Sequence, residues 1–255
     1  NHNDKTSERS EQGYVNKERT MEAKTVDVSR GIAWFTGGWR IFMKNPGLWI
    51  VLGVITLIIA VALFLLPFVG MLALSLLMPV FAAGLLYAAR EADEGRTLDV
   101  AHLFQGFREK DRLTPLLSLG GVALAGTVVS LALFIMIGGG SMLAMMAGGQ
   151  REMMGGAIAG MLLALPVVLG VQLLVALALI YAVPLVMFRG VPASQAMGSS
   201  LRANLRNILP LLVSGVLYLF VAVLATLPLL LGWLVLLPVS VGMLYRSYKD
   251  LYEPA

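Results

Sequence analysis

Four carboxylates lie close together in the sequence and are the side chains best suited to acid–base chemistry: Glu91, Asp93, Glu94 and Asp99. Hydrolysis would also need a nucleophile and a base beside them, and the neighbouring sequence offers neither. Charges in such a polar segment are usually solvated at the protein surface. We therefore expect no catalytic residue and no enzymatic activity. An intramembrane hydrolase that uses these carboxylates is the alternative.

Composition limits metal and thiol chemistry. The chain has no cysteine, which excludes disulfides, thiolate catalysis, Cys-ligated zinc and iron–sulfur clusters. Its two histidines are His2, near the start, and His102, which we expect to be an interfacial side chain. The sequence therefore predicts no metal site and no cofactor.

Most of the chain that positions the charged residues is apolar. Of the 255 residues 58% are hydrophobic and 13% are charged, with a mean hydropathy of +0.82, whereas soluble domains are about a quarter charged. Residues 47–66 form an uncharged run of 20 residues. About 20 apolar residues in a helix cross a hydrocarbon core of about 30 Å. We therefore predict an all-α integral membrane protein, and we expect no nucleic-acid partner.

The uncharged runs predict six transmembrane helices as three hairpins, at residues 47–66, 68–89, 116–137, 157–188, 208–227 and 229–245. The fourth run is longer than one span needs and contains Pro166 and Pro184, so we expect it to be tilted, kinked or extended beyond the bilayer.

An amphipathic interfacial helix is expected before each hairpin, in units that cover residues 28–90, 97–188 and 192–246. The segments PVFAAGLLY (79–87) and PVSVGMLY (238–245) are alike and occupy corresponding places in the first and third units. The three hairpins are therefore interpreted as pseudo-repeats.

Charge distribution predicts the orientation of the chain. Of the 19 Lys and Arg residues, all but Arg151 fall on one side of the six-helix arrangement. Positive charge marks the cytoplasmic side of a bacterial inner membrane, so both termini are expected in the cytoplasm. Residues 1–26 are expected to be a disordered tail, 27–246 the transmembrane domain and 247–255 a polar cytoplasmic tail.

The first interfacial segment has apolar side chains at helical spacing, at Val28, Ile32, Phe35, Trp39 and Phe42, with cations on the opposite face. Such a helix suits the boundary between water and lipid. The cations that we expect to hold anionic phospholipid headgroups, here and in the third interfacial segment, are Arg30, Arg40, Lys44, Arg202 and Arg206. The aromatic residues expected to set the depth in the membrane are Trp34, Trp39, Phe42 and Trp49.

No charged residue lies inside the six predicted spans, which counts against a transporter coupled to protons or ions. Gln172 is the most polar residue at mid-span, and we expect its amide to form an interhelical hydrogen bond. A substrate contact by Gln172 and Tyr181 is the alternative.

Two resemblances follow from short motifs. The stretches RGIAW (30–34), GWRIF (38–42), NP (45–46) and LFQGFR (103–108) resemble an uncharacterised family of proteobacterial inner-membrane proteins over residues 28–250. PASQA (192–196) with Ser200, Leu201, Arg202 and Asn204 is similar, more weakly, to the membrane domain beside some glycerophosphodiester phosphodiesterases. The second resemblance implies a shared membrane scaffold and not the activity, since no phosphodiesterase motif accompanies it.

These observations favour a non-enzymatic accessory or scaffold protein of a bacterial inner membrane that binds anionic phospholipid and a membrane protein complex. The competing hypothesis is a carrier or flippase for a lipid or apolar solute, with a cavity near Gln172, Tyr181 and Pro184. Such a path would need no buried charge.

Overall fold

The computed structural model describes residues 22–147, 150–227 and 231–253, with side chains described outside 138–159. All regular structure in these residues is helical. The elements in chain order are α2 (Arg30–Lys44), α3 (Pro46–Phe64), α4 (Val69–Asp93), the 3-10 turn η1 (Val100–Phe104), α5 (Gln105–Arg108), α6 (Lys110–Ala147), α7 (Gln150–Leu179), α8 (Ala182–Arg189), α9 (Ala193–Arg206), α10 (Ile208–Thr226) and α11 (Trp233–Tyr252).

Five helical stretches in the described residues are long and apolar enough to cross a membrane: Pro46–Phe64, Val69–Asp93, Lys110–Ile137, Gly160–Arg189 and Ile208–Thr226. Their outward side chains are exposed and apolar, as a lipid environment requires. The protein is therefore an all-α, multi-pass membrane protein. The sixth predicted span, at 229–245, is not among the five, because α11 begins at Trp233 and carries Arg246, Lys249 and Asp250 in its second half.

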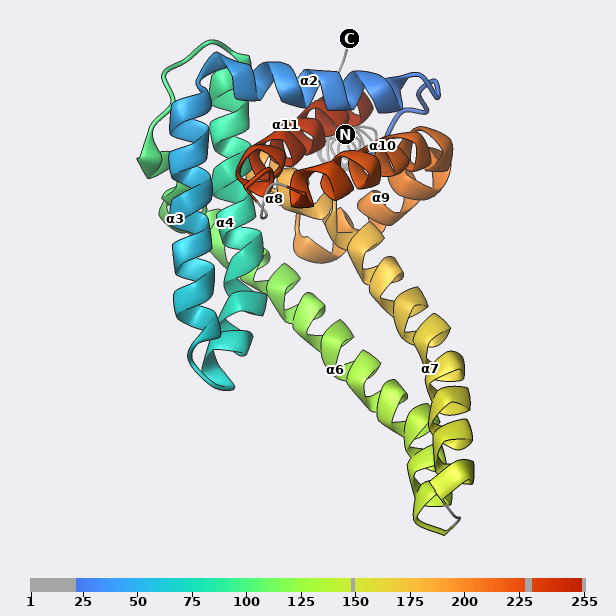
Figure 1. Ribbon diagram of the computed structural model, residues 1–255. Helices are drawn as coiled ribbons and strands as arrows, with labels where there is room; N and C mark the ends of the chain where they lie inside the picture. Colours follow the sequence, from blue (N-terminus) through green and yellow to red (C-terminus); the bar gives the residue numbers. More distant parts are fainter. Residues whose placement is uncertain (1–21, 148–149, 228–230, 254–255) are drawn as a thin grey trace, which may run out of the picture.

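The helices form two long hairpins joined at one end by a cluster of shorter elements (Figure 1). Helices α3 and α4 run side by side, and the α6–α7 hairpin extends away from them. Helix α2 lies across the top, with α10 and α11 below it. The third predicted hairpin therefore does not run alongside the first, since α10 and α11 lie across the direction of α3 and α4.

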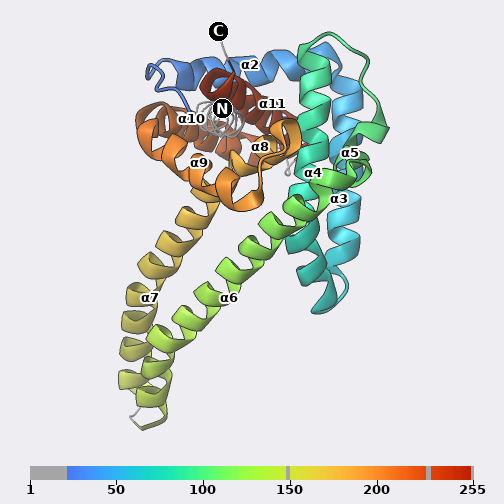
Figure 2. The ribbon, with the colours of Figure 1, turned by 180° about the vertical axis from the view of Figure 1, so that it is seen from behind.

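The interfacial segments pack on the ends of the spans. Element α2 packs on α11, η1–α5 on α4, and α9 on α7–α8 (Figures 1 and 2). Glycine makes two of these contacts close: a Cβ on Gly38 would lie 2.4 Å from the Val239 carbonyl oxygen, and one on Gly106 would lie 2.5 Å from the Val80 carbonyl oxygen. Each contact therefore falls on the residue that follows a helical proline, Pro238 or Pro79.

The fourth predicted run is broken between α7 and α8. Proline cannot donate a backbone hydrogen bond, and Pro184 lies in the first turn of α8. At the break the Ser200 hydroxyl accepts from the Tyr181 N–H at 3.0 Å and donates to the Leu177 carbonyl at 2.7 Å. The Asn204 amide donates to the same carbonyl at 2.7 Å. Two side chains of α9 thus complete the backbone hydrogen bonding of a kinked span.

Both ends of the described chain are more ordered than the sequence predicts. Residues 1–21 of the predicted tail lie outside the described residues, but residues 22–26 are attached to the helices. The Asn207 side chain accepts from the Val26 N–H at 2.9 Å and donates to the Lys24 carbonyl at 3.0 Å. At the other end α11 continues to Tyr252, because Tyr248, Leu251 and Tyr252 extend its buried stripe.

Candidate lipid-binding site

The charged ends of α4 and α11 form one cluster around Asp93. Its carboxylate accepts from Arg246 Nη1 at 3.0 Å and from Lys249 Nζ at 2.9 Å. Lys44 Nζ donates to the backbone carbonyls of Ala92 and Asp93 at 2.7 and 2.9 Å, where the negative end of the helix dipole favours a cation. Two cations therefore pair with the Asp93 carboxylate and a third lies on the adjacent carbonyls, so the cluster holds three cations to one carboxylate and keeps a positive charge.

Asp250 organises the start of α2. It accepts from Arg30 Nε at 2.9 Å and from the Trp34 indole N–H at 2.7 Å. The Arg30 side chain remains 43% exposed, so its ion pair to Asp250 leaves part of the guanidinium open to solvent or headgroups. Trp34 is 2% exposed and packs against α11.

The predicted headgroup cations therefore fall into two groups. Arg30 and Lys44 have protein partners in the two clusters described above. Arg40, Arg202 and Arg206 are exposed, and none forms a hydrogen bond or ion pair with another described residue. These last three guanidinium groups are available to an anionic ligand.

The predicted aromatic anchors are placed differently from one another. Trp34, Phe42 and Trp49 are 2%, 4% and 0% exposed, so they contact protein instead of acyl chains, whereas Trp39 is 46% exposed. The Trp49 indole N–H donates to the Ile41 carbonyl at 3.2 Å inside the core. The hydrophobic pattern does not show this, because close packing through Gly31 and Gly38 turns Trp34 and Phe42 toward the protein.

The two predicted intramembrane polar residues do not lie together. Gln172 Nε2 donates to Ser130 Oγ at 3.2 Å and joins α7 to α6, as expected of a structural interhelical hydrogen bond. Tyr181 is 2% exposed in the core, with its ring centroid 5.9 Å from that of Tyr252. Neither residue lines the apolar cavity of the protein.

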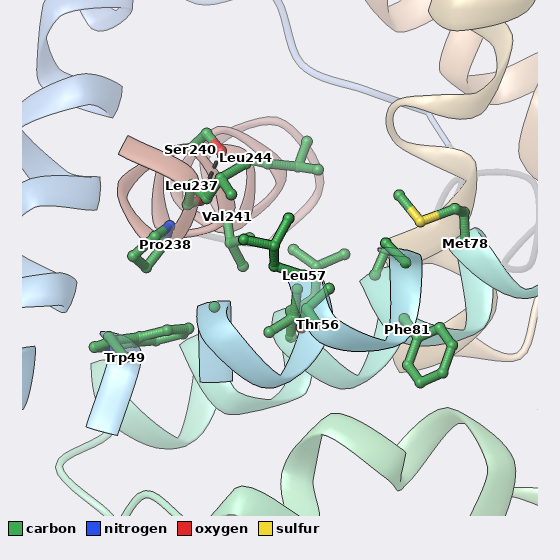
Figure 3. A pocket seen from close by; sticks show the side chains of 15 residues that line it. Trp49, Thr56, Leu57, Met78, Phe81, Leu237, Pro238, Ser240, Val241 and Leu244 are labelled. Carbon is green, nitrogen blue, oxygen red and sulfur yellow. Dashed lines mark hydrogen bonds between the residues drawn. The ribbon is translucent and has the colours of Figure 1, made fainter. Parts of the chain in front are cut away.

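That cavity of about 330 Å³ lies between α3, α4 and α11 (Figure 3). Its walls are almost entirely apolar: Trp49, Gly53, Thr56, Leu57, Ala60, Met78, Phe81, Ala82, Leu85, Leu86, Leu237, Pro238, Ser240, Val241 and Leu244.

The two hydroxyl groups in these walls are already satisfied within their own helices. Thr56 donates to the Leu52 carbonyl at 2.8 Å and Ser240 to the Leu237 carbonyl at 2.7 Å. The cavity therefore suits an alkyl chain and offers no group that would fix a polar ligand. Sequence reasoning missed it, although Gly53, Ala60 and Ala82 are the small residues that create the space.

The carboxylates considered for acid–base chemistry have structural partners. Glu91 accepts from Arg96 Nε at 2.5 Å, and Glu94 also pairs with Arg96. The hydrogen bonds that Arg96 donates to Glu91 raise the pKa of Arg96 above its usual range. Asp99 accepts from the Ala101 N–H at 2.7 Å and caps η1. Among the described residues no three or more His, Asp or Glu side chains gather in a group that could hold a metal ion.

Comparison with known proteins gives a limited match. The chain is 28% identical over 137 residues to a protein of Burkholderia thailandensis named as a probable inner membrane protein; the match covers 53% of this chain and 51% of that protein. No protein-family model matches the chain, and no solved structure matches it significantly. The relative and the five apolar helices fit a multi-pass inner-membrane protein. They support the resemblance to proteobacterial inner-membrane proteins, and not the one to phosphodiesterase membrane domains.

Proposed function

We propose that this is a non-enzymatic accessory or scaffold protein of the inner membrane that retains a phospholipid. The observation that supports the proposal is the apolar cavity beneath a positive cluster. Leu86, in the cavity wall, lies two turns before Asp93 on α4, and Leu244 lies just before Arg246 on α11. An acyl chain fits the cavity, and the phosphate of the same lipid fits Arg246 and Lys249. Each buried CH₂ group adds about 0.8 kcal/mol of binding free energy.

The remaining cations extend this lipid contact. Arg40, Arg202 and Arg206 are exposed and unpaired among the described residues, so they can attract the anionic headgroups of surrounding phospholipids. This is consistent with the positive-inside orientation, in which α2, α9 and both termini lie on the cytoplasmic side. Trp39, with its exposed ring, would lie at the headgroup level.

The proposal includes the six-span, three-unit layout. In that layout residues 229–245 would form the sixth span, and α10 and α11 would have to turn from their direction across α3 and α4. Supporting observations are the matching contacts of Gly38 with Val239 and of Gly106 with Val80. The shared scaffold with phosphodiesterase membrane domains is likewise a proposal, supported by the structural role of Ser200 and Asn204 at the α7–α8 break.

A partner complex would use the exposed apolar helices. The α6–α7 hairpin extends away from the other helices, and Val128, Leu131 and Leu163 on it are 59%, 58% and 67% exposed.

A carrier for a lipid is the second candidate, favoured by the α3–α4–α11 cavity. Its path would start there instead of near Gln172 and Tyr181, whose polar groups face protein.

The test is to fill the cavity. Gly53 lines it, and a Cβ at this position would lie 3.9 Å from its nearest neighbour, the Leu234 carbonyl oxygen, so Gly53→Leu has room to enter. Gly215 on α10 has open space around its Cβ, and Gly215→Leu is the matched control. Native mass spectrometry of the full chain extracted from membranes should show phospholipid bound to the wild type and to Gly215→Leu, and a loss of most of it in Gly53→Leu. Equal retention by both variants would refute the proposal.

A further inference from the structure

A second, polar pocket of about 590 Å³ lies where the chain enters α2 and where α11 ends. Its lining is charged apart from one residue: Lys24, Val26, Asp27, Arg30, Arg246, Lys249, Asp250 and Glu253. One wall is the segment before α2. This wall is fixed in place, because the Lys24 N–H donates to the Leu251 carbonyl at 2.9 Å and Asn207 bonds both Lys24 and Val26.

The pocket has hydrogen-bond donors to spare. Arg30 uses Nε and Nη2 on Asp250, and Arg246 uses Nη1 on Asp93, out of five N–H groups on each guanidinium. Lys249 Nζ makes one hydrogen bond to Asp93 and has three protons. The four cations of the lining face its three carboxylates, and Asp93 outside the lining pairs with two of the cations. The remaining donors suit the several oxygens of a phosphate group.

The pocket also has two carboxylates that form no ion pair with a described residue. The Glu253 carboxylate forms no hydrogen bond or ion pair with another described residue. Asp27 accepts from the Ser29 N–H at 2.9 Å, and its hydrogen bonds with Ser29 lower its pKa, so it is ionised at neutral pH. Both carboxylates belong to the pocket lining. Lys24 Nζ donates to the Glu253 backbone carbonyl at 2.8 Å and not to its carboxylate, so both carboxylates could accept from a positively charged ligand group.

We infer that this pocket binds a ligand that carries both a phosphate and an amine, of the phosphoethanolamine type. Arg30, Arg246 and Lys249 would hold the phosphate, and Glu253 with Asp27 would hold the ammonium group. Charge-assisted hydrogen bonds would form at both ends of such a ligand. The inference deepens the proposed function, since phosphatidylethanolamine is one source of this group. The other source is a free phosphoamine.

The pocket can be tested by calorimetric titration of the full chain in detergent micelles with phosphoethanolamine, inorganic phosphate and ethanolamine. Phosphoethanolamine should bind about tenfold more tightly than phosphate. Glu253→Gln should remove that advantage without weakening phosphate binding. The control is Asp111→Asn, which changes an exposed carboxylate on α6 that has no hydrogen bond or ion pair with a described residue and lies outside the pocket lining.

Two further variants complete the test. Lys249→Gln should weaken phosphate and phosphoethanolamine together. Gly53→Leu fills the apolar cavity without changing a residue of the polar pocket, so it should not weaken phosphoethanolamine binding, and failure of the acyl-chain site is distinguishable from failure of the headgroup site. Equal affinity for phosphate and phosphoethanolamine, or an equal loss in Asp111→Asn, would overturn the inference.

The source of the ligand is decided in nanodiscs of mixed phosphatidylethanolamine and phosphatidylglycerol. If the lipid headgroup is the source, Glu253→Gln lowers the share of phosphatidylethanolamine that co-purifies. If a free phosphoamine is the source, that share is unchanged while the calorimetric loss persists.

Discussion

The Ser200 hydroxyl accepts the hydrogen bond of the Tyr181 N–H at 3.0 Å, in place of a backbone carbonyl. The same hydroxyl donates a hydrogen bond to the Leu177 carbonyl at 2.7 Å, so Ser200 bridges two backbone groups that would bond to each other directly in a continuous helix. Both Ser200 and Tyr181 are buried, at 0% and 2% exposure. The break in the span therefore depends on α9 for its polar satisfaction.

Ser200→Ala should destabilise the protein by about 1–3 kcal/mol, because the buried Tyr181 N–H would lose its acceptor, while the Leu177 carbonyl would keep only its hydrogen bond from Asn204. Unfolding by SDS in mixed micelles, followed by circular dichroism, measures the free energy. Ser118→Ala is the control, since the Ser118 hydroxyl is exposed and bonds only to Thr114 of its own helix among the described residues. An equal loss in both variants would contradict the bridge.

Gly38→Ala should separate α2 from α11. A Cβ here would lie 2.4 Å from the Val239 carbonyl oxygen and 2.6 Å from the Met243 nitrogen, so backbone must move. We expect a loss of about 1–3 kcal/mol in unfolding free energy. Gly121→Ala in α6 has no neighbour near the new Cβ and should stabilise by about 0.4–1 kcal/mol. A stable Gly38→Ala protein would show that the contact is looser than described.

Trp34 and Asp250 should be energetically coupled. A double-mutant cycle of Trp34→Phe and Asp250→Ala isolates their hydrogen bond, for which we expect a coupling energy of about 1.5 kcal/mol because the acceptor is charged. Fluorescence should agree: the Trp34 emission shifts to longer wavelength in Asp250→Ala. A coupling energy near zero would mean that the indole is held by packing alone.

Gln172 and Ser130 should be coupled more weakly. Interhelical hydrogen bonds within membranes average about 0.6 kcal/mol, because the unfolded helices also find partners in the bilayer. The cycle of Gln172→Leu and Ser130→Ala should therefore give a coupling energy of that order. A much larger loss of function than of stability in Gln172→Leu would favour the substrate-contact alternative.

How far the sequence predicts this molecule varies from element to element. The uncharged run at 47–66 and the break after Asn45 are local features, and α3 begins at Pro46 with Asn45 as its cap. The buried face of α2 is not predictable from apolar spacing, because Gly31 and Gly38 define it through the neighbours that approach them. Gln172 found a partner on α6 as its polarity demands, yet the sequence alone does not name Ser130.

The candidate site was less predictable than the spans. Arg40, Arg202 and Arg206 are exposed, as is usual for charged side chains. Arg30 and Lys44 instead have partners from the other end of the chain and from α4. The apolar cavity depends on how α11 meets α3 and α4, a relationship over long sequence separation that periodicity does not contain.

The most direct test of the central claim uses Trp49, which lines the cavity and is otherwise buried in protein. An acyl chain can therefore contact its indole only by entering the cavity. Two single-tryptophan proteins retain either Trp49 or Trp34, with the other three tryptophans replaced by Phe. Each is reconstituted with phospholipid brominated on the acyl chains, which quenches indoles in contact with bromine. If a lipid chain occupies the cavity, Trp49 is quenched and buried Trp34 is not, and Gly53→Leu removes the quenching. Equal, weak quenching of Trp49 and Trp34 would contradict the lipid-binding account.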